Sequence, residues 1–297
     1  MNHFNRVGCL RQPTRFLNTN FMSYYSILNL NKEPFSTSPD PYFFYPSVSH
    51  KQAIQRLEIA IRLKRGLSVI LGDVGIGKTT LARALIQELH STNGAITHMV
   101  LDPTYDSEFQ FITTLAKLFG IKGSFRSTLD YKEAIERFLF KKCVDEGRII
   151  SLIIDEGQKM SLSSLEALRT FLNYETNEYK LLQLVIMGQM ELLPKLQRIN
   201  NFSDRISLKY ILNPLDYNET KNMIEFRLRQ AGALSGKEMF TEKAILIIYQ
   251  YTQGYPRKIA SLCHNLLEEL VMKDRRIIEE DLVNEVIEKD RKVVLVT

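Results

Sequence analysis

A glycine-rich loop with one lysine constrains this chain more than any other feature. Residues 72–79 read GDVGIGKT and fit the pattern GxxxxGK[ST], with an apolar stretch before them and a helical pattern after them. Glycines let successive N–H groups turn inward toward phosphate oxygens, and the start of the following helix adds partial positive charge. We therefore expect a phosphate-binding loop made by Gly72, Asp73, Val74, Gly75, Ile76, Gly77, Lys78, Thr79 and Thr80.

The same loop predicts the bound species. Lys78 supplies a point charge for the β- and γ-phosphates, and the hydroxyl of Thr79 is a ligand for Mg²⁺. A second stretch, 149–155 (IISLIID), has the apolar character of a buried strand and ends at Asp155, which Glu156 follows. Acids at the carboxyl end of a buried parallel strand lie where such sheets bind ligands. We expect ATP with Mg²⁺, the metal held by Thr79 and Asp155, and a water oriented and polarised by Glu156.

Three further polar residues are candidates for the γ-phosphate. Arg205 precedes an apolar stretch, Arg257 opens a helical pattern in the sequence GYPR, and Gln189 follows a buried stretch. Arginines there would neutralise charge that develops on the phosphate. From the residues alone, an exposed surface position explains each equally well. For His50 and the aromatic residues 42–45, core packing is favoured over lining a base pocket.

Hydrophobic periodicity predicts an α/β core followed by a helical part. Short apolar strands alternate with helical patterns and lie at 67–71, 95–102, 149–155, 181–188 and 206–212. This alternation indicates a parallel five-stranded sheet of the P-loop type with helices on both faces. After Pro214 only helical patterns remain, at 216–231, 241–252, 256–273 and 279–290. We expect a disordered tail at 1–22, an α/β nucleotide-binding domain at 23–213 and a helical lid at 214–297.

Composition excludes several classes of protein. The apolar fraction is 44% and the formal net charge is +5, so neither a disordered chain nor a strongly basic nucleic-acid binder is indicated. The three cysteines have no metal-ligand spacing. No apolar run approaches the roughly 20 residues of a membrane helix. We therefore expect no integral membrane segment and a cytoplasmic location.

The motifs taken together resemble the AAA+ ATPases. More narrowly, the chain resembles the general secretion pathway protein A (ExeA) group, which includes ATPases of type IV (MSHA) pilus biogenesis. The resemblance covers about residues 23–290 and rests most specifically on the stretches PFSTSPDPYFF, LEALRTFLNYETNEYKLLQ and GQMEL. Departures are small: this chain has DEGQ and GQMEL where the group often has DEAQ and GQPEL.

The resemblance implies roles for the remaining residues. It makes Lys78 and Thr79 Walker A, Asp155 and Glu156 Walker B, and Gln189 sensor 1. It makes Arg257 a sensor 2 residue that acts from the lid on the nucleotide. Arg205 matches the arginine finger, which acts in trans on a neighbouring subunit, so the resemblance implies a homo-oligomer. Longer members continue into a membrane span and a peptidoglycan-binding domain, which we do not expect in this sequence.

Three functions remain open. The first is an ATPase that drives conformational change for a secretion or pilus assembly system through a protein partner. The second is a transposition-accessory ATPase that selects target DNA and binds duplex DNA, for which scattered basic residues such as Lys117 and Lys209 offer weak support. The third is a nucleotide switch without hydrolysis, which intact Asp155 and Glu156 disfavour.

Overall fold

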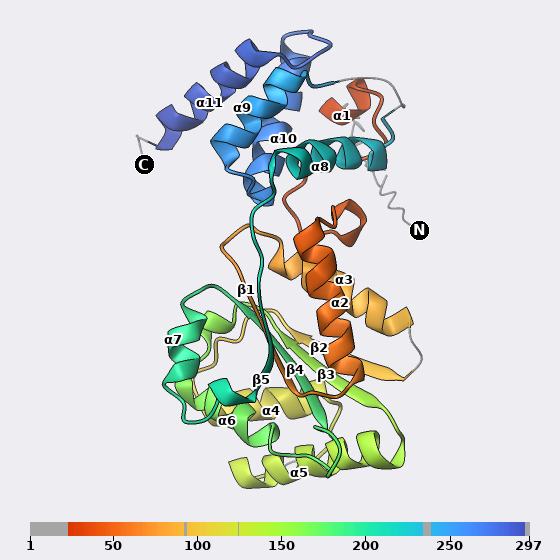
Figure 1. The fold of residues 1–297 in the computed structure, drawn as a ribbon, viewed down its shortest axis with the longest axis vertical. Coiled ribbons are helices and arrows are strands. Elements are labelled where there is room, and N and C mark those ends of the chain that lie inside the picture. The colour runs from red at the N-terminus through yellow and green to blue at the C-terminus, as the bar shows by residue number, and fades with distance from the viewer. Residues whose placement is uncertain (1–22, 92–93, 124, 234–238, 295–297) are drawn as a thin grey trace, which may run out of the picture.

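The computed structural model describes residues 23–91, 94–123, 125–233 and 239–294. The predicted tail, 1–22, lies outside the described residues. The described part contains a five-stranded parallel sheet in the order β2-β3-β4-β1-β5 (Figure 1). Its strands are β1 (Leu67–Leu71), β2 (Ala95–Val100), β3 (Ile149–Ile154), β4 (Leu182–Gly188) and β5 (Ile206–Ile211). The predicted fold class is confirmed.

Helices cover both faces of this sheet. One face packs against α2 (Val48–Arg62) and α3 (Lys78–Ser91), through a cluster that includes Leu57, Leu85 and Ile70. The other face packs against α4 (Glu108–Leu118), α5 (Thr128–Phe140), α6 (Leu162–Phe171) and α7 (Leu192–Gln197). Alternate residues of β1 serve the two faces, because Val69 and Leu71 belong to the second cluster and Ile70 to the first.

Helix boundaries follow local signals. Ser161 accepts a hydrogen bond from the N–H of Ser164 and caps α6. The helical apolar spacing of residues 129–146 does not give one continuous α-helix, because α5 ends at Phe140 and a π-turn, η2 (Lys141–Asp145), follows. After α2 the left-handed residue is Lys64, with φ 51°, and Gly66 follows with φ 90°. Shorter 3₁₀ turns are η1 (Pro41–Phe43), η3 (Gly157–Lys159) and η4 (Ser203–Arg205).

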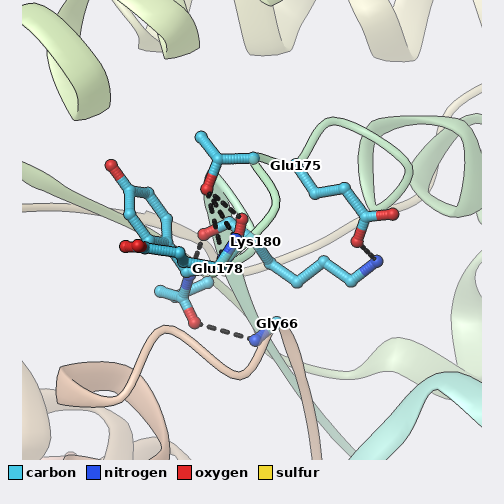
Figure 2. Close-up of polar contacts among 7 residues, drawn as sticks. Gly66, Glu175, Glu178 and Lys180 are labelled. Carbon is cyan, nitrogen blue, oxygen red and sulfur yellow. Dashed lines mark hydrogen bonds and ion pairs between the residues drawn. The ribbon is translucent and has the colours of Figure 1, made fainter.

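A turn before β4 connects the amino-terminal ends of β4 and β1 through hydrogen bonds. The side chain of Gln183, 1% exposed, accepts a hydrogen bond from the N–H of Gly66 (2.9 Å) and donates one to the carbonyl of Lys180 (2.8 Å). Thr176 caps the turn through the N–H groups of Glu178 and Tyr179, and Lys180 pairs with Glu175 (Figure 2). These residues come from the LNYETNEYKLLQ stretch, so its role in the structure is to form this turn.

The helical part follows the sheet and lies above it in Figure 1. It contains α8 (Tyr217–Gln230), α9 (Glu242–Thr252), α10 (Pro256–Met272) and α11 (Glu280–Val294), of which α11 runs past the predicted end at 290. Thr241 caps α9 by accepting a hydrogen bond from the N–H of Ala244. In the described residues, no helix is both long and apolar enough to cross a membrane.

The segment before α2 packs mainly with the helical part, although Phe44 at its end packs against the cluster formed by α2, α3 and the sheet. It includes the short helix α1 (Tyr24–Ile27), and its residues Leu30, Phe35 and Phe43 belong to the same buried cluster as α8–α11. The domain boundaries at 22 and 213 remain predictions. Residues 30–43 pack in the same core as the lid helices. The chain therefore begins beside the lid, continues into the sheet and returns to the lid at α8.

Candidate nucleotide-binding site

The glycine-rich loop joins β1 to α3, as the motif requires. Gly75 and Gly77 have φ values of 80° and 103°, which L-residues rarely adopt. Space is limiting as well, since a Cβ atom on Gly75 would lie 2.9 Å from the Cβ of Arg257. A Cβ on Gly77 would lie 3.1 Å from Nε2 of His50. The two glycines therefore allow both the turn and its close packing.

His50 contacts the phosphate loop on its buried side. Its Nε2 lies 3.1 Å from the carbonyl of Ile76 and its Nδ1 lies 2.7 Å from Oγ of Ser47. A carbonyl can only accept, so Nε2 carries the proton and Nδ1 accepts from the serine. The ring is 1% exposed, and burial lowers the pKa of His50. A neutral His50 thus holds the loop in place, which agrees with the structural role favoured for this residue.

Lys78 begins α3 and is 6% exposed. Its Nζ donates to the carbonyls of Gly72 (2.9 Å) and Asp73 (3.0 Å). Burial lowers the pKa of Lys78, and the nearby carboxylates of Glu156 and Asp155 oppose this shift. A protonated amine held by two carbonyls at the loop is positioned to receive phosphate oxygens.

The loop and the end of β3 meet at Thr79 and Asp155. Oγ1 of Thr79 donates to Oδ2 of Asp155 over 2.5 Å, and Oδ1 of the same carboxylate accepts from the N–H of Glu156 over 2.9 Å. Asp155 is 2% exposed. A hydroxyl and a carboxylate in contact are oxygen donors of the kind that Mg²⁺ prefers, so the residues present fit this metal.

Glu156 has an unusual backbone. Its φ is 52°, in the left-handed region, which non-glycine residues occupy mainly where surrounding structure enforces it. Its Oε2 accepts a hydrogen bond from Nε2 of Gln158 (2.8 Å), and Oε1 of Gln158 accepts from the N–H of Gln189 (3.1 Å). This chain of bonds fixes the direction of the carboxylate.

A cavity of about 360 Å³ lies over the loop, between the sheet and the lid. Its lining residues come from four places: the phosphate loop and start of α3, the end of β3, the segment 36–39, and the lid helices α8 and α10. They are Ser36, Thr37, Ser38, Pro39, Val74, Gly75, Gly77, Lys78, Thr79, Thr80, Glu156, Arg227, Pro256, Arg257 and Ala260. Its size and position suit a nucleotide with phosphates at the loop.

Most of the sequence-predicted residues meet at this cavity. Arg257 lines it, and its N–H donates to the carbonyl of Gly75 over 3.1 Å. The hydroxyl of Tyr255 donates to Oδ2 of Asp73 over 2.7 Å, which adds a second contact between α10 and the loop. Of the site residues predicted from the sequence, those that do not line the cavity are Gly72, Asp73, Ile76, Asp155, Gln189 and Arg205.

Those exceptions have distinct positions. Ile76 is buried in the cluster beneath the loop. The N–H of Gln189 donates to Oε1 of Gln158, and its carbonyl accepts from the N–H of Leu192. Arg205 lies at the start of β5, where Ile206 pairs with Leu67, the first residue of β1. The phosphate loop follows the other end of β1, so Arg205 is remote from the loop of its own chain.

Sequence reasoning missed two parts of the cavity wall. Arg227 lies on α8, and the segment Ser36–Pro39 precedes the first long helix, so neither is near the loop in sequence. Both fall in stretches that carry the family resemblance, FRLRQAGA and PFSTSPDPYFF. Only the folded arrangement shows that these stretches face the site.

Comparison with known proteins gives one matching domain family and two curated relatives. Residues 61–196 match the family described as AAA domain. General secretion pathway protein A of Aeromonas hydrophila is 32% identical over 253 residues, which cover 82% of this chain and 44% of that protein. The chain thus spans less than half of that relative. An HTH-type transcriptional regulator of Methanocaldococcus jannaschii is 24% identical over 296 residues, covering 87% of this chain and 72% of that protein.

Solved structures agree on the fold. Drosophila ORC bound to DNA matches with a TM-score of 0.63 at 16% identity, covering 95% of this chain and 70% of that one. Cdc6p of Pyrobaculum aerophilum matches with a TM-score of 0.62 at 17% identity, covering 84% and 71%. The Thermotoga maritima RuvB branch migration motor matches with a TM-score of 0.55 at 18% identity, covering 83% and 72%. The chain therefore contains a match to the AAA domain at 61–196, has the fold of these P-loop structures, and is similar to general secretion pathway protein A over most of its own length.

Proposed function

We propose that this protein binds Mg-ATP and hydrolyses it to drive a conformational change. One observation carries the proposal: Lys78, Thr79 and Glu156 line one cavity, and Asp155 joins Thr79 there. Each supplies a different requirement of phosphoryl transfer, namely positive charge, metal ligands and a base. If these residues only formed an exposed turn, nothing would require a cation, metal ligands and a base to lie around one cavity.

Each group of residues has a separate role in ATP binding and hydrolysis. The loop N–H groups and Lys78 bind the phosphates, and Thr79 and Asp155 are the residues that would hold Mg²⁺. When bound, the metal neutralises charge that develops on the phosphate oxygens. Glu156, fixed by Gln158, orients a water and accepts its proton. Arg257 adds positive charge from the lid.

We also propose that the active form is a homo-oligomer. Arg205 cannot serve the loop of its own chain from the opposite end of β1, so its expected action on phosphate requires a second copy. Its Nε is buried and has no hydrogen-bond partner among the described residues. Gln189 keeps its proposed sensor role next to Gln158, close to the carboxylate of Glu156.

The process that hydrolysis serves is proposed from the relatives. Similarity to general secretion pathway protein A favours a secretion or pilus-type assembly system, with a protein partner in the cytoplasm, where ATP is available. The alternative is a DNA-dependent ATPase of the transposition-accessory kind. Its support is that a structure with the same fold is of a complex bound to DNA.

Phosphate release by the purified protein tests this proposal. We expect hydrolysis of ATP that stops when EDTA removes Mg²⁺ and returns when Mg²⁺ is restored. The assay is repeated with duplex DNA at low and high salt. Stimulation by DNA that fades with salt would favour the DNA-dependent alternative, because phosphate contacts weaken as counterions compete. A slow rate indifferent to DNA would favour a protein partner, and no hydrolysis that depends on Mg²⁺ would contradict the proposal.

A further inference from the structure

Lys195 is a charged residue close to the site that the proposed chemistry does not use. It lies on α7, and its side chain is half-buried. Its Nζ donates to the carbonyl of Gln158 and to the carbonyl of Met160, the latter over 3.2 Å. None of the ion pairs in the described part of the chain includes Lys195. There, its ammonium group binds main-chain carbonyls and no carboxylate.

Both carbonyls belong to the turn η3 and the residue after it, directly beyond Glu156. Gln158 and Met160 are 7% and 1% exposed, so their carbonyls have little access to water. A buried carbonyl without a donor costs free energy. Lys195 supplies a donor to each of the two, and it therefore stabilises the turn in its present position.

The position of this turn sets the position of the proposed base. Nε2 of Gln158 donates to Oε2 of Glu156 over 2.8 Å. The carbonyl of Gln158 is held by Lys195, and its Oε1 is held by the N–H of Gln189. Gln158 is thus fixed at two points, by α7 and by the end of β4. A movement of the turn would carry the amide of Gln158, and with it the carboxylate of Glu156, out of place.

Packing restrains the same turn against β4 and α7. A Cβ atom on Gly157 would clash with Cγ2 of Ile186 and lie 3.5 Å from Cδ2 of Leu192. Glu156 just before it has φ 52°, a backbone that a non-glycine residue keeps where its surroundings enforce it. Close packing prevents the turn from moving nearer to the strand. The hydrogen bonds from Lys195 oppose movement of the turn away from α7.

We infer that Lys195 is a positioning residue for Glu156, which holds the base in place through the carbonyls of the turn. The inference rests on the proposed function, in which Glu156 orients a water and accepts its proton. Misplacement of a catalytic group by about 1 Å can cost about 100-fold in rate. Loss of Lys195 should therefore slow hydrolysis and leave ATP binding unchanged, because the phosphate loop follows a different strand.

A double-mutant cycle with Glu156→Gln tests the inference. Lys195→Met keeps the length of the side chain without its N–H donors, and Arg198→Met removes an exposed cation at the end of the same helix as a matched control. In the wild-type background we expect Lys195→Met to lower kcat about tenfold or more, with the Kd for ATP within about twofold. In the Glu156→Gln background, Lys195→Met should change the residual rate by less than about twofold, because the base that Lys195 positions is already absent. Arg198→Met should match its parent in both backgrounds.

Two further variants separate positioning from folding. Lys195→Arg keeps the charge and the N–H donors, so it should recover most of the kcat that Lys195→Met loses. Thermal unfolding without ligand compares the stability of all variants. If Lys195→Met is unfolded at the assay temperature, Lys195→Gln, which keeps one donor group, takes its place in the cycle with the same expected result.

Three results would overturn the inference. The first is an unchanged kcat in Lys195→Met. The second is an equal fall in rate in both backgrounds, because a residue that acted only on the fold would lower the rate whether or not Glu156 is present. The third is a loss of ATP affinity as large as the loss of kcat, which would place the effect at nucleotide binding.

Failure of the inference is distinct from failure of the proposed function. If wild type hydrolysed no ATP in the presence of Mg²⁺, both would fail together. An active wild type with an unaffected Lys195→Met would refute the inference alone and leave the proposed function standing.

Discussion

At the scale of single residues, the site depends on groups that hold other groups in place. His50 does not line the cavity over the phosphate loop, yet its Nε2–H donates to the carbonyl of Ile76 within that loop. Its Nδ1 accepts from Ser47, which fixes the ring. This arrangement needs the neutral imidazole, because a protonated Nδ1 could no longer accept that hydrogen bond.

The neutral state of His50 predicts a pH dependence of stability. Burial holds its pKa below the ordinary value of 6.5, so below that pH the unfolded chain binds a proton that the folded chain does not. Folding stability should therefore fall as pH drops below about 6.5, by at most about 1.4 kcal/mol per pH unit from this group. Denaturant unfolding of wild type and His50→Gln between pH 7.5 and 5.5 measures the difference. Equal pH slopes for the two proteins would refute this role.

Some site residues were predictable and others were not. Lys78, Thr79, Asp155 and Glu156 sit in short motifs whose chemistry requires those residue types, so the sequence reveals them. The left-handed backbone of Glu156 carries no local signal, since the neighbouring contacts impose it. Arg227 was missed because one arginine in a helical pattern looks like any exposed one until the lid is folded over the site.

At the scale of elements, the join between β5 and α8 meets the join between α9 and α10. The N–H of Leu215 donates to the carbonyl of Gly254 over 2.9 Å. Gly254 has φ 73°, and a Cβ atom there would lie 1.9 Å from the carbonyl oxygen of Leu215. This contact connects the strand that leads into the lid with the start of α10, which carries Tyr255 and Arg257.

Substitution of Gly254 should therefore disturb more than its own backbone. Gly254→Ala is compared with Gly120→Ala, because Gly120 has a similar φ of 72° but nothing within 4 Å of its Cβ position. The left-handed backbone alone costs about 1–2 kcal/mol in each variant. The clash adds about 1–3 kcal/mol to Gly254→Ala only. Equal unfolding midpoints for the two variants, measured by denaturant titration, would show that the Leu215 contact can relax freely.

Element prediction succeeded where periodicity is strong. Each of the five predicted strands appears, and the most buried ones are β1, β3 and β4, which are apolar apart from Ser68, Ser151 and Gln183. Helix ends carry weaker signals, because Lys64 after α2 and Gln253 after α9 adopt the left-handed conformation in which glycine is the more usual residue. Periodicity also cannot show that Phe35 and Phe43 pack into the lid, because this depends on contacts far apart in the sequence.

At the scale of the whole molecule, the proposed role of Arg205 would leave the catalytic site incomplete in one copy of the chain. The predicted finger residue Arg205 lies at the end of β1 away from the loop, while the other expected catalytic groups lie at the cavity or beside it. An oligomer in which Arg205 of one subunit reaches the cavity of the next would complete the site. Each interface would then combine Glu156 from one subunit with Arg205 from its neighbour.

Mixing two inactive variants tests this arrangement. Arg205→Ala and Glu156→Gln should each lose most hydrolysis, since an arginine finger contributes about 10³-fold or more in related phosphoryl transfers. A mixture should recover part of the activity, because some interfaces then combine an intact Glu156 with an intact Arg205. Phosphate release is measured across mixing ratios. Activity of the mixture that never exceeds that of the separate variants would argue against action between subunits.

The proposal that Glu156 is the base for ATP hydrolysis at this cavity is tested most directly by measuring ATP hydrolysis and ATP binding in Glu156→Gln. Glu178→Gln serves as the control, because Glu178 is exposed in the turn before β4. We expect Glu156→Gln to hydrolyse ATP at least about 100-fold more slowly than wild type, which is the usual contribution of a general base. The variant should bind ATP about as tightly as wild type does. The control should match wild type in both measurements. If Glu156→Gln hydrolysed ATP at the wild-type rate, the assignment of this cavity as the catalytic site would be wrong.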